Sequence, residues 1–223
     1  MNESDPACDL VIPCRDEAVA LPGVLALVPD GFHVVVVDNG SQDATADVAY
    51  EHGASVVYEP VAGYGAAVHT GVQAASADYL AVLDGDGSLD ARELPRLLED
   101  VRSGRCTMAV GRRRPISARV WPWHARAGTV ALAWLIRRRS RLPIHDLAPM
   151  RVCRRDELVA LGVRDRRFGY PLELMLKAAR AGWTVREHDV TYSARASGSR
   201  SKVSGSLRGT TLTAIDFAKA AWR

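Results

Sequence analysis

The fold is decided by the stretch Tyr79-Leu80-Ala81-Val82-Leu83-Asp84-Gly85-Asp86-Gly87-Ser88, an apolar run that ends in two carboxylates separated by one glycine. An unbroken apolar run of this length is typical of a strand covered on both faces. In open α/β sheets, ligands bind beyond the carboxyl ends of such strands. The oxygen atoms of Asp84 and Asp86 suit Mg²⁺ or Mn²⁺, which takes its remaining ligands from a substrate diphosphate. The stretch therefore predicts a metal-bound diphosphate, with an ordinary acidic turn as the alternative.

Three further apolar runs precede this stretch, and each ends in a polar turn. They cover residues 9–13, 32–37 and 54–58, and a helical stretch is expected from about residue 18 to 27. Alternating strands and helices indicate βαβ units and a mostly parallel sheet. Right-handed crossovers place the turns on one edge of that sheet. We therefore expect three turns to converge: Pro13–Glu17, Asp38–Ser41 and Asp84–Ser88.

Four segments, taken in order, resemble the signature of the GT-A glycosyltransferases of family 2. They are Pro13-Cys14-Arg15-Asp16-Glu17, Val36-Val37-Asp38-Asn39-Gly40-Ser41-Gln42-Asp43-Ala44-Thr45, Gly63-Tyr64-Gly65-Ala66-Ala67 and Leu83-Asp84-Gly85-Asp86. Three later segments are similar to the dolichyl-phosphate mannosyltransferase-like branch of that family. They are Asp146-Leu147-Ala148-Pro149-Met150-Arg151, Gly169-Tyr170-Pro171-Leu172-Glu173 and Arg195-Ala196-Ser197-Gly198-Ser199-Arg200-Ser201-Lys202. The resemblance covers nearly the whole chain and implies a GT-A fold, which is α/β with a Rossmann-like, mostly parallel central sheet flanked by helices.

Length and composition agree with one compact enzyme domain. The chain has 223 residues, of which 48% are hydrophobic and 25% charged, and can bury a sizeable core. We expect a single domain over residues 1–223, with a nucleotide-sugar-binding half (1–110), an acceptor-binding half (111–205) and a C-terminal helix (206–223). The polar N-terminus lacks the apolar segment of a signal peptide, and the four cysteines form no CxxC pair. Both features favour a cytoplasmic protein.

The resemblance implies a donor site built from the first two turns. Pro13, Arg15 and Glu17 match the first nucleotide-contacting turn, and Val36 and Asp38 match the next strand end, where Asp38 binds the base. Such polar contacts select a nucleotide because an unmatched base leaves buried polar groups unpaired. The expected donor is a GDP- or UDP-linked sugar. A helix-initiating turn and a capping box are the structural alternatives for these two segments.

The resemblance divides the other donor contacts between a metal ion and basic side chains. Asp86 is the expected direct ligand of Mg²⁺ or Mn²⁺, Asp84 acts through water or on the ribose, and Gly85 lies between them. Ser88 is a further and weaker ligand. The metal neutralises charge on the leaving diphosphate. The family positions that contact phosphates are occupied by Arg113, Arg195 and Lys202, and guanidinium and ammonium groups suit phosphate oxygens.

The acceptor implied by the resemblance is a polyprenyl phosphate. A phosphate monoester is already ionised at neutral pH, its second pKa being near 6, so no general base is obligatory. Asp146 is then expected to orient Arg151 or a sugar hydroxyl, whereas it would be the general base for an alcohol acceptor. The catalytic residues implied are Asp146, Arg113 and Arg151, and Glu173 is expected to contact the sugar or to be a packed helix carboxylate.

The segment from residue 121 to 141 predicts contact with a membrane or with the core. Its uncharged apolar run, residues 127–136, is only ten residues long and too short to cross a bilayer. Tryptophans prefer the headgroup level, and the arginines that follow would face anionic lipid. A core helix with a basic C-terminal end is the other reading, and residues 206–222 predict a final helix.

Other functions have less support in the sequence. The same donor chemistry could serve a soluble or different lipid alcohol as acceptor. A nucleotidyltransferase typically carries a Gly-rich loop after its first strand, and residues 13–17 contain no glycine. An inactive sugar-nucleotide-binding module is disfavoured by the intact pair Asp84 and Asp86. The arginine clusters occur without a helix-turn-helix, RRM or zinc-finger pattern, so nucleic acid is not an expected partner.

Overall fold

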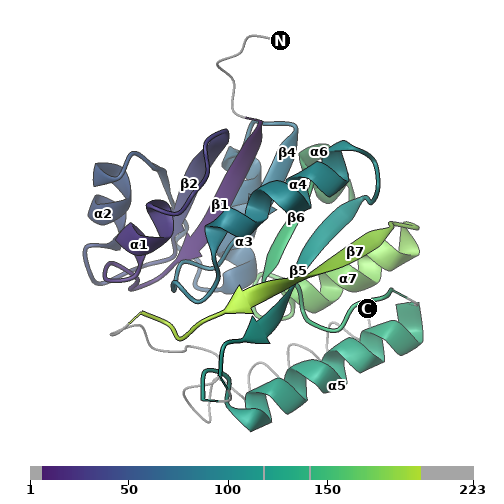
Figure 1. The fold of residues 1–223 in the computed structure, drawn as a ribbon. Coiled ribbons are helices and arrows are strands. Elements are labelled where there is room, and N and C mark those ends of the chain that lie inside the picture. The colour runs from purple at the N-terminus through teal and green to yellow at the C-terminus, as the bar shows by residue number, and fades with distance from the viewer. Residues whose placement is uncertain (1–6, 118, 141, 197–223) are drawn as a thin grey trace.

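The structure, a computed structural model, describes residues 7–117, 119–140 and 142–196. In this part of the chain, seven strands form one sheet with the order β3-β2-β1-β4-β6-β5-β7 (Figure 1). The strands are β1 (Cys8–Cys14), β2 (Phe32–Asp38), β3 (Ser55–Tyr58), β4 (Tyr79–Val82), β5 (Met108–Pro115), β6 (Met150–Arg154) and β7 (Val185–Tyr192). Strand β6 runs antiparallel to β4 and β5, and the other neighbouring strands are parallel. The predicted α/β class with a mostly parallel sheet is confirmed.

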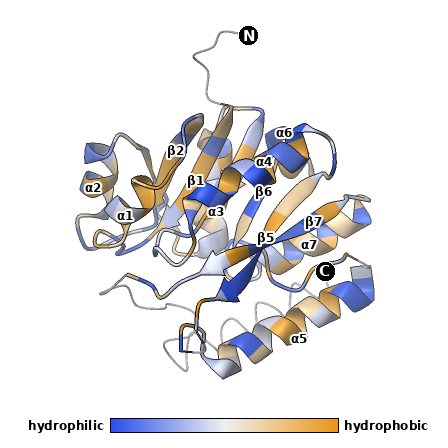
Figure 2. Cartoon of the chain, in the orientation of Figure 1, coloured by the Kyte–Doolittle hydropathy of each residue, from blue (hydrophilic) through white to orange (hydrophobic). Residues whose placement is uncertain are grey.

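Helices cover both faces of this sheet. They are α1 (Leu21–Leu25), α2 (Thr45–Glu51), α3 (Tyr64–Ala74), α4 (Leu94–Arg102), α5 (Trp123–Ser140), α6 (Arg155–Ala160) and α7 (Tyr170–Arg180), with a 3₁₀ turn, η1 (Ala91–Glu93), before α4. Side chains alternate across each strand. Val11 of β1 packs in a core with α3 and α7, whereas Leu10 and Ile12 pack in a second core with α1 and α4. This double burial explains why β1 and β2 are mostly apolar, as their orange colour shows in Figure 2.

The predicted strands near the N-terminus are present, but the first helix is shorter than expected. Pro22 lies in the first turn of α1, where its missing N–H costs no hydrogen bond. The helix ends at Leu25, and it could not extend through Val28, because that residue precedes Pro29 and a residue before proline disfavours helical backbone. The predicted run 127–136 lies within α5. The predicted helix at residues 206–222 lies outside the described residues.

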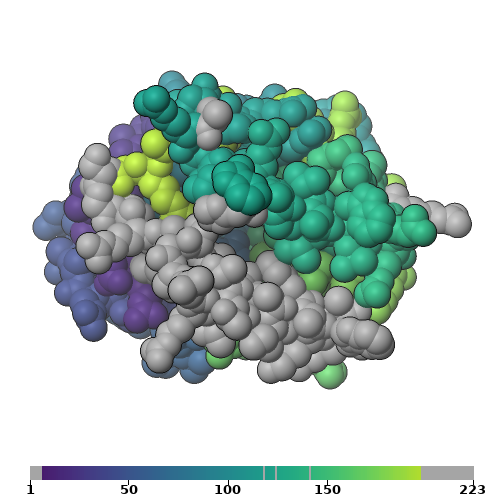
Figure 3. All heavy atoms as spheres, turned by 90° about the horizontal axis from the view of Figure 1, so that it is seen from below, coloured from purple at the N-terminus to yellow at the C-terminus, as the bar shows by residue number. Residues whose placement is uncertain are grey.

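The turns after β1, β2 and β4 meet at one edge of the sheet. The backbone N–H of Asn39 donates to the carbonyl of Cys14 at 2.9 Å, and that of Asp16 donates to the Ser41 hydroxyl at 3.0 Å. A Cβ added to Gly85 would lie 2.6 Å from the Cys14 sulfur, so glycine allows the acidic turn to approach β1. The predicted convergence of the three turns is confirmed. Figure 3 looks at this side of the molecule, which carries the purple and blue N-terminal segments and the teal α5.

Candidate active site

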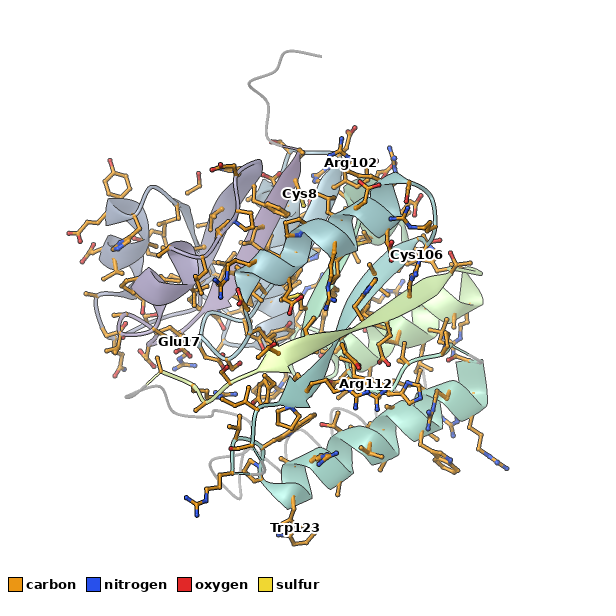
Figure 4. The ribbon with its side chains drawn as sticks, in the orientation of Figure 1. Cys8, Glu17, Arg102, Cys106, Arg112 and Trp123 are labelled. Atoms are coloured by element: carbon orange, nitrogen blue, oxygen red, sulfur yellow. The ribbon has the colours of Figure 1, made fainter. Side chains whose placement is uncertain are left out.

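A cavity of about 580 Å³ opens where these turns meet. It gathers residues from both halves of the chain, including the segment after β7. Eight of the residues that the sequence predicts for the site line it: Pro13, Arg15, Glu17, Asp84, Gly85, Asp86, Arg113 and Arg195. Figure 4 shows Glu17 at the lower end of β1, on the side where the cavity opens. The sequence therefore brings acidic and basic side chains to one concave site, the usual form of a small-molecule site.

The two carboxylates after β4 line the cavity, with Asp86 buried and Asp84 partly exposed. Burial and the charge of Asp86 raise the pKa of Asp84 to about 6, so the pair disfavours its doubly ionised form. Asp86 is only 4% exposed, and its Oδ1 accepts a hydrogen bond at 2.9 Å from the backbone N–H of Ser88. Like charges held this way favour a cation between them, and two carboxylates facing a cavity fit Mg²⁺ or Mn²⁺. No group of three or more His, Cys, Asp or Glu side chains suited to a metal occurs in the part of the chain described.

Arg195 supplies the positive charge next to Asp86. Its Nε lies 3.1 Å from Asp86 Oδ2. The segment after β7 is held on the acidic turn by its backbone, because Ser193 N–H donates to the Ser88 carbonyl at 2.8 Å and Ala196 N–H to the Asp86 carbonyl at 3.1 Å. Ser88 is buried beside the pair and contributes its backbone N–H and carbonyl to these contacts. The predicted phosphate contact Lys202 lies outside the described residues.

Asp146 and Arg113 form a buried ion pair at the rim of the cavity. Asp146 is 2% exposed, and its Oδ2 accepts from the backbone N–H and the Nε of Arg113, both at 2.9 Å. Its Oδ1 accepts from an Arg113 terminal nitrogen and from the Leu147 N–H, both at 2.7 Å. The Arg113 guanidinium also lies over the Trp121 ring, 4.1 Å from its centroid. Asp146 therefore orients Arg113 and not the predicted Arg151, whereas its predicted contact with a sugar hydroxyl stays a prediction.

Arg151 lies deeper, below the cavity. It is 1% exposed and donates to the Ala148 carbonyl at 3.1 Å and to the Tyr64 hydroxyl at 3.3 Å. Its guanidinium carbon lies 5.5 Å from the centroid of the Tyr170 ring. Tyr64 lines the cavity, and burial raises the pKa of its phenol, which keeps the hydroxyl protonated at neutral pH. Arg151 thus contacts Tyr64, which lines the cavity, and is not itself part of the lining. No role was predicted for Tyr64.

Glu173 holds a loop beside the cavity. Its carboxylate accepts from the backbone N–H groups of Arg164 and Asp165 at 3.0 and 2.6 Å, and it lies 3.3 Å from Lys177 Nζ. Burial alone would raise the pKa of Glu173, but these hydrogen bonds outweigh burial and hold the pKa below its usual value. Glu173 is thus a packed helix carboxylate, one of the two roles predicted for it. A contact of Glu173 with a sugar stays a prediction.

The loop held by Glu173 packs against the start of α3. Arg166 and Arg167 accept hydrogen bonds through their carbonyls from the first N–H groups of that helix, Ala66 and Gly65, at 2.8 and 3.0 Å. A Cβ on Gly65 would lie 2.4 Å from the Asp165 carbonyl oxygen, so only glycine fits there. The glycines of the segment Gly63–Ala67 therefore serve close packing of this loop, which positions Tyr64.

Two residues predicted for the nucleotide-sugar site, Val36 and Asp38, are not among those that line the cavity. Val36 is fully buried in the core between the sheet and α1. The Asp38 carboxylate accepts hydrogen bonds from the backbone N–H and the hydroxyl of Ser41, which forms a turn. Asn39 lines the cavity instead, and its side chain holds the Glu59 and Val61 carbonyls, each at 2.8 Å. Contact of Asp38 with a base stays a prediction.

The fold and the paired carboxylates define a GT-A-like glycosyltransferase. The chain belongs to glycosyl transferase family 2, which matches residues 9–155. It is 54% identical to an uncharacterized glycosyltransferase of Mycobacterium tuberculosis, over 96% of this chain and 97% of that protein. It is 30% identical to a dolichyl-phosphate hexose transferase of Haloferax volcanii (84% and 83% covered) and 29% identical to an undecaprenyl-phosphate mannosyltransferase of Micrococcus luteus (89% and 88%).

Solved structures with the same fold carry a metal and a nucleotide. Glucosyl-3-phosphoglycerate synthase from Mycobacterium tuberculosis, in complex with Mn²⁺, UDP and glucosyl-3-phosphoglycerate, has a TM-score of 0.74 at 20% identity, over 96% of this chain and 77% of that chain. A complex of the same enzyme holds Mg²⁺ and UDP, with a TM-score of 0.73. At this identity, the likeness establishes the fold.

Proposed function

We propose that the protein transfers a hexose from a nucleoside-diphosphate sugar to a polyprenyl phosphate, with inversion at the anomeric carbon and with Mg²⁺ or Mn²⁺ bound. The observation that carries the proposal is the cavity in which Asp84 and Asp86 face Arg113 and Arg195. Carboxylates alone would repel a diphosphate, and arginines alone would need no acidic turn. Both sets serve a ligand made of a metal ion and a diphosphate.

The donor diphosphate fits between the acidic turn and the two arginines. Asp84 and Asp86 would hold the metal, which supplies Lewis-acid stabilisation of the leaving nucleoside diphosphate. The relatives with solved structures bind UDP with Mn²⁺ or Mg²⁺, which supports this assignment. Arg113, fixed by Asp146 and Trp121, presents a preorganised guanidinium to the charge that develops on the leaving group. Arg195 can exchange its contact with Asp86 for a phosphate oxygen when the metal binds.

A phosphate acceptor agrees with the state of Asp146. Each of its two carboxylate oxygens accepts two hydrogen bonds. Asp146 therefore orients Arg113 and is poorly placed to remove a proton. A polyprenyl phosphate needs no such base, because its charge is about −1.5 to −2 at neutral pH. Its oxygen forms the new bond to the anomeric carbon while the bond to the nucleoside diphosphate breaks. The names of the Haloferax volcanii and Micrococcus luteus relatives support this acceptor class.

The test is transfer of label from a panel of UDP- and GDP-linked sugars to a short-chain polyprenyl phosphate, followed by organic extraction. We expect label in the lipid phase with one donor, only when Mg²⁺ or Mn²⁺ is present. Asp86→Asn should abolish it, and Asp90→Asn, which changes an acid four residues away that pairs with Arg92, should not. Parallel arms with free polyprenol and with phosphoglycerate test the alcohol and soluble acceptors. Transfer to polyprenol or to phosphoglycerate, with no transfer to polyprenyl phosphate, would overturn the proposed acceptor.

A further inference from the structure

One face of α5 exposes large apolar side chains. Trp123 is 80% exposed, Val130 52% and Trp134 51%. With the exposed Ala127 and Arg138, they follow one another at intervals of three or four residues and so share one side of the helix. We call these five residues the α5 face. Soluble proteins rarely expose a contiguous apolar stripe of this kind, and where they do, it marks an interaction site.

The opposite side of α5 anchors the helix to the body of the protein. Ala133 and Ile136 are buried, and Ile136 belongs to the core that includes α7 residues such as Leu172 and Met175. The α5 face is therefore held outward by packing behind it. Figure 4 shows Trp123 pointing away from the ribbon at the lower end of the molecule. The core reading of this segment thus holds for one side of α5.

The segment of the chain that contains α5 carries basic residues and no acidic ones. Residues 101–145 contain eleven arginines and no aspartate or glutamate. Three of these arginines, Arg137, Arg138 and Arg139, form the last turn of α5. The Arg138 guanidinium carbon lies 5.5 Å from the Trp134 ring centroid, so an aromatic ring and a cation occupy the same surface. An apolar stripe with tryptophans and a basic end complements the surface of an anionic bilayer.

The α5 face lies on the side of the molecule where the cavity opens. The carboxyl ends of β1 and β2 point downward in Figure 1, and α5 runs below the sheet. Figure 3, seen from below, shows α5 and the N-terminal turns on the same side. A bilayer against α5 would therefore meet the molecule beside the cavity that Pro13–Glu17 and Asp84–Asp86 line.

We propose that the α5 face docks the protein on the surface of an anionic lipid bilayer, lying in the headgroup region without crossing it. No helix within the described ranges is long and apolar enough to span a membrane, which agrees with a helix that lies in the interface plane. The proposal rests on the proposed function in one respect, since a polyprenyl phosphate is presented from a membrane. The binding itself needs neither donor nor acceptor.

The test is co-flotation of the full chain with vesicles that contain neither polyprenyl phosphate nor nucleotide sugar. We expect binding to vesicles of phosphatidylcholine with phosphatidylglycerol, and at least about tenfold weaker binding to phosphatidylcholine alone. The double variant Trp123→Ala/Trp134→Ala should bind anionic vesicles at least about tenfold less tightly. Arg138→Gln should lower the affinity about fivefold and make binding less sensitive to salt. Tyr50→Ala, at a 77% exposed aromatic on α2, is the matched control and should bind as the wild type does.

Besides an absence of wild-type binding to anionic vesicles, two results would overturn the proposal. One is equal binding of the wild type and the double tryptophan variant. The other is a concentration-dependent dimer in sedimentation experiments without lipid that Trp134→Ala abolishes, because a second copy of the chain would then cover the α5 face. Failure of sugar transfer to polyprenyl phosphate with vesicle binding intact would refute the acceptor and leave the docking surface standing. Loss of vesicle binding with transfer intact in detergent would do the reverse.

Discussion

Replacing Asp84 with asparagine is expected to stabilise the protein in EDTA at neutral pH while abolishing metal-dependent donor binding. Burial and the neighbouring Asp86 raise the pKa of Asp84 from 3.8 to about 6 in the folded protein. Keeping Asp84 ionised at pH 7 therefore costs folding free energy. A shift of about two pKa units corresponds to about 3 kcal/mol. Because Asp84 lines the cavity and keeps part of its contact with water, the gain expressed by Asp84→Asn is about 1 to 3 kcal/mol.

The pH dependence separates this explanation from a change in packing. The folded-state pKa of Asp84 lies above its unfolded value, so the side chain carries no penalty below pH 3.8, where it is protonated in both states. The cost in folding free energy develops as the pH rises from 3.8 and is complete above about 6. The advantage of Asp84→Asn should thus be largest at pH 7 and shrink as the pH falls toward 4. Thermal unfolding in EDTA should show a Tm about 2 to 10 °C above the wild type at pH 7.

The matched control is Asp86→Asn, because Asp86 is paired with Arg195 and its replacement removes an ion pair. It should raise the Tm less than Asp84→Asn does, because it relieves the repulsion on Asp84 but loses the pairing with Arg195. Adding Mn²⁺ with UDP or GDP should raise the Tm of the wild type and of neither variant. A Tm of Asp84→Asn below that of the wild type at pH 7, or a gain in Tm of the same size at pH 7 and pH 4, would show that ionised Asp84 does not destabilise the fold.

Three further substitutions test the supports of the cavity. Gly85→Ala should destabilise the protein by about 1 to 3 kcal/mol, because its Cβ would meet the Cys14 sulfur; denaturant unfolding should show Cys14→Ala recovering part of the loss, and an additive double variant would contradict the contact. Glu173→Gln should lower the Tm at pH 7, where the ionised carboxylate stabilises the fold through its hydrogen bonds. At a pH below the depressed pKa of Glu173 it should have little effect, because the wild-type side chain is then protonated, and an equal loss of Tm at every pH would contradict this role. Arg195→Gln should leave Mn²⁺ affinity intact and weaken UDP or GDP binding about tenfold in calorimetry, whereas loss of Mn²⁺ affinity alone would contradict a phosphate contact.

Local patterns were enough to predict the N-terminal half of the fold. The apolar runs of β1, β2 and β4 each end in a polar turn, and parallel strands with right-handed crossovers leave one arrangement for those turns. The lining of the cavity by Pro13, Arg15 and Asp86 follows from this rule. The antiparallel β6 between β4 and β5 has no such signature, because it depends on pairing between segments far apart in the chain.

Side-chain partners across long sequence separations could not be predicted. Asp146 pairs with Arg113, 33 positions earlier, because β5 and the segment before β6 meet beside the cavity. The nearer Arg151 turns inward to Tyr64. Tyr64 lies in the segment Gly63–Ala67, which resembles the family signature. A large aromatic residue at the start of a helix, on the ligand side of the sheet, was the signal that could have pointed to Tyr64.

The most direct measurement is the initial rate of sugar transfer to polyprenyl phosphate and to free polyprenol of the same chain length, as a function of pH. We expect transfer to the phosphate alone, with a rate that rises as the pH passes roughly 6 and then levels off, as the acceptor ionises. Asp146→Asn should keep measurable turnover and the same acidic limb, because its role is to orient Arg113. Transfer to polyprenol but not to polyprenyl phosphate, with a loss of about 10²- to 10⁴-fold in Asp146→Asn, would contradict the account.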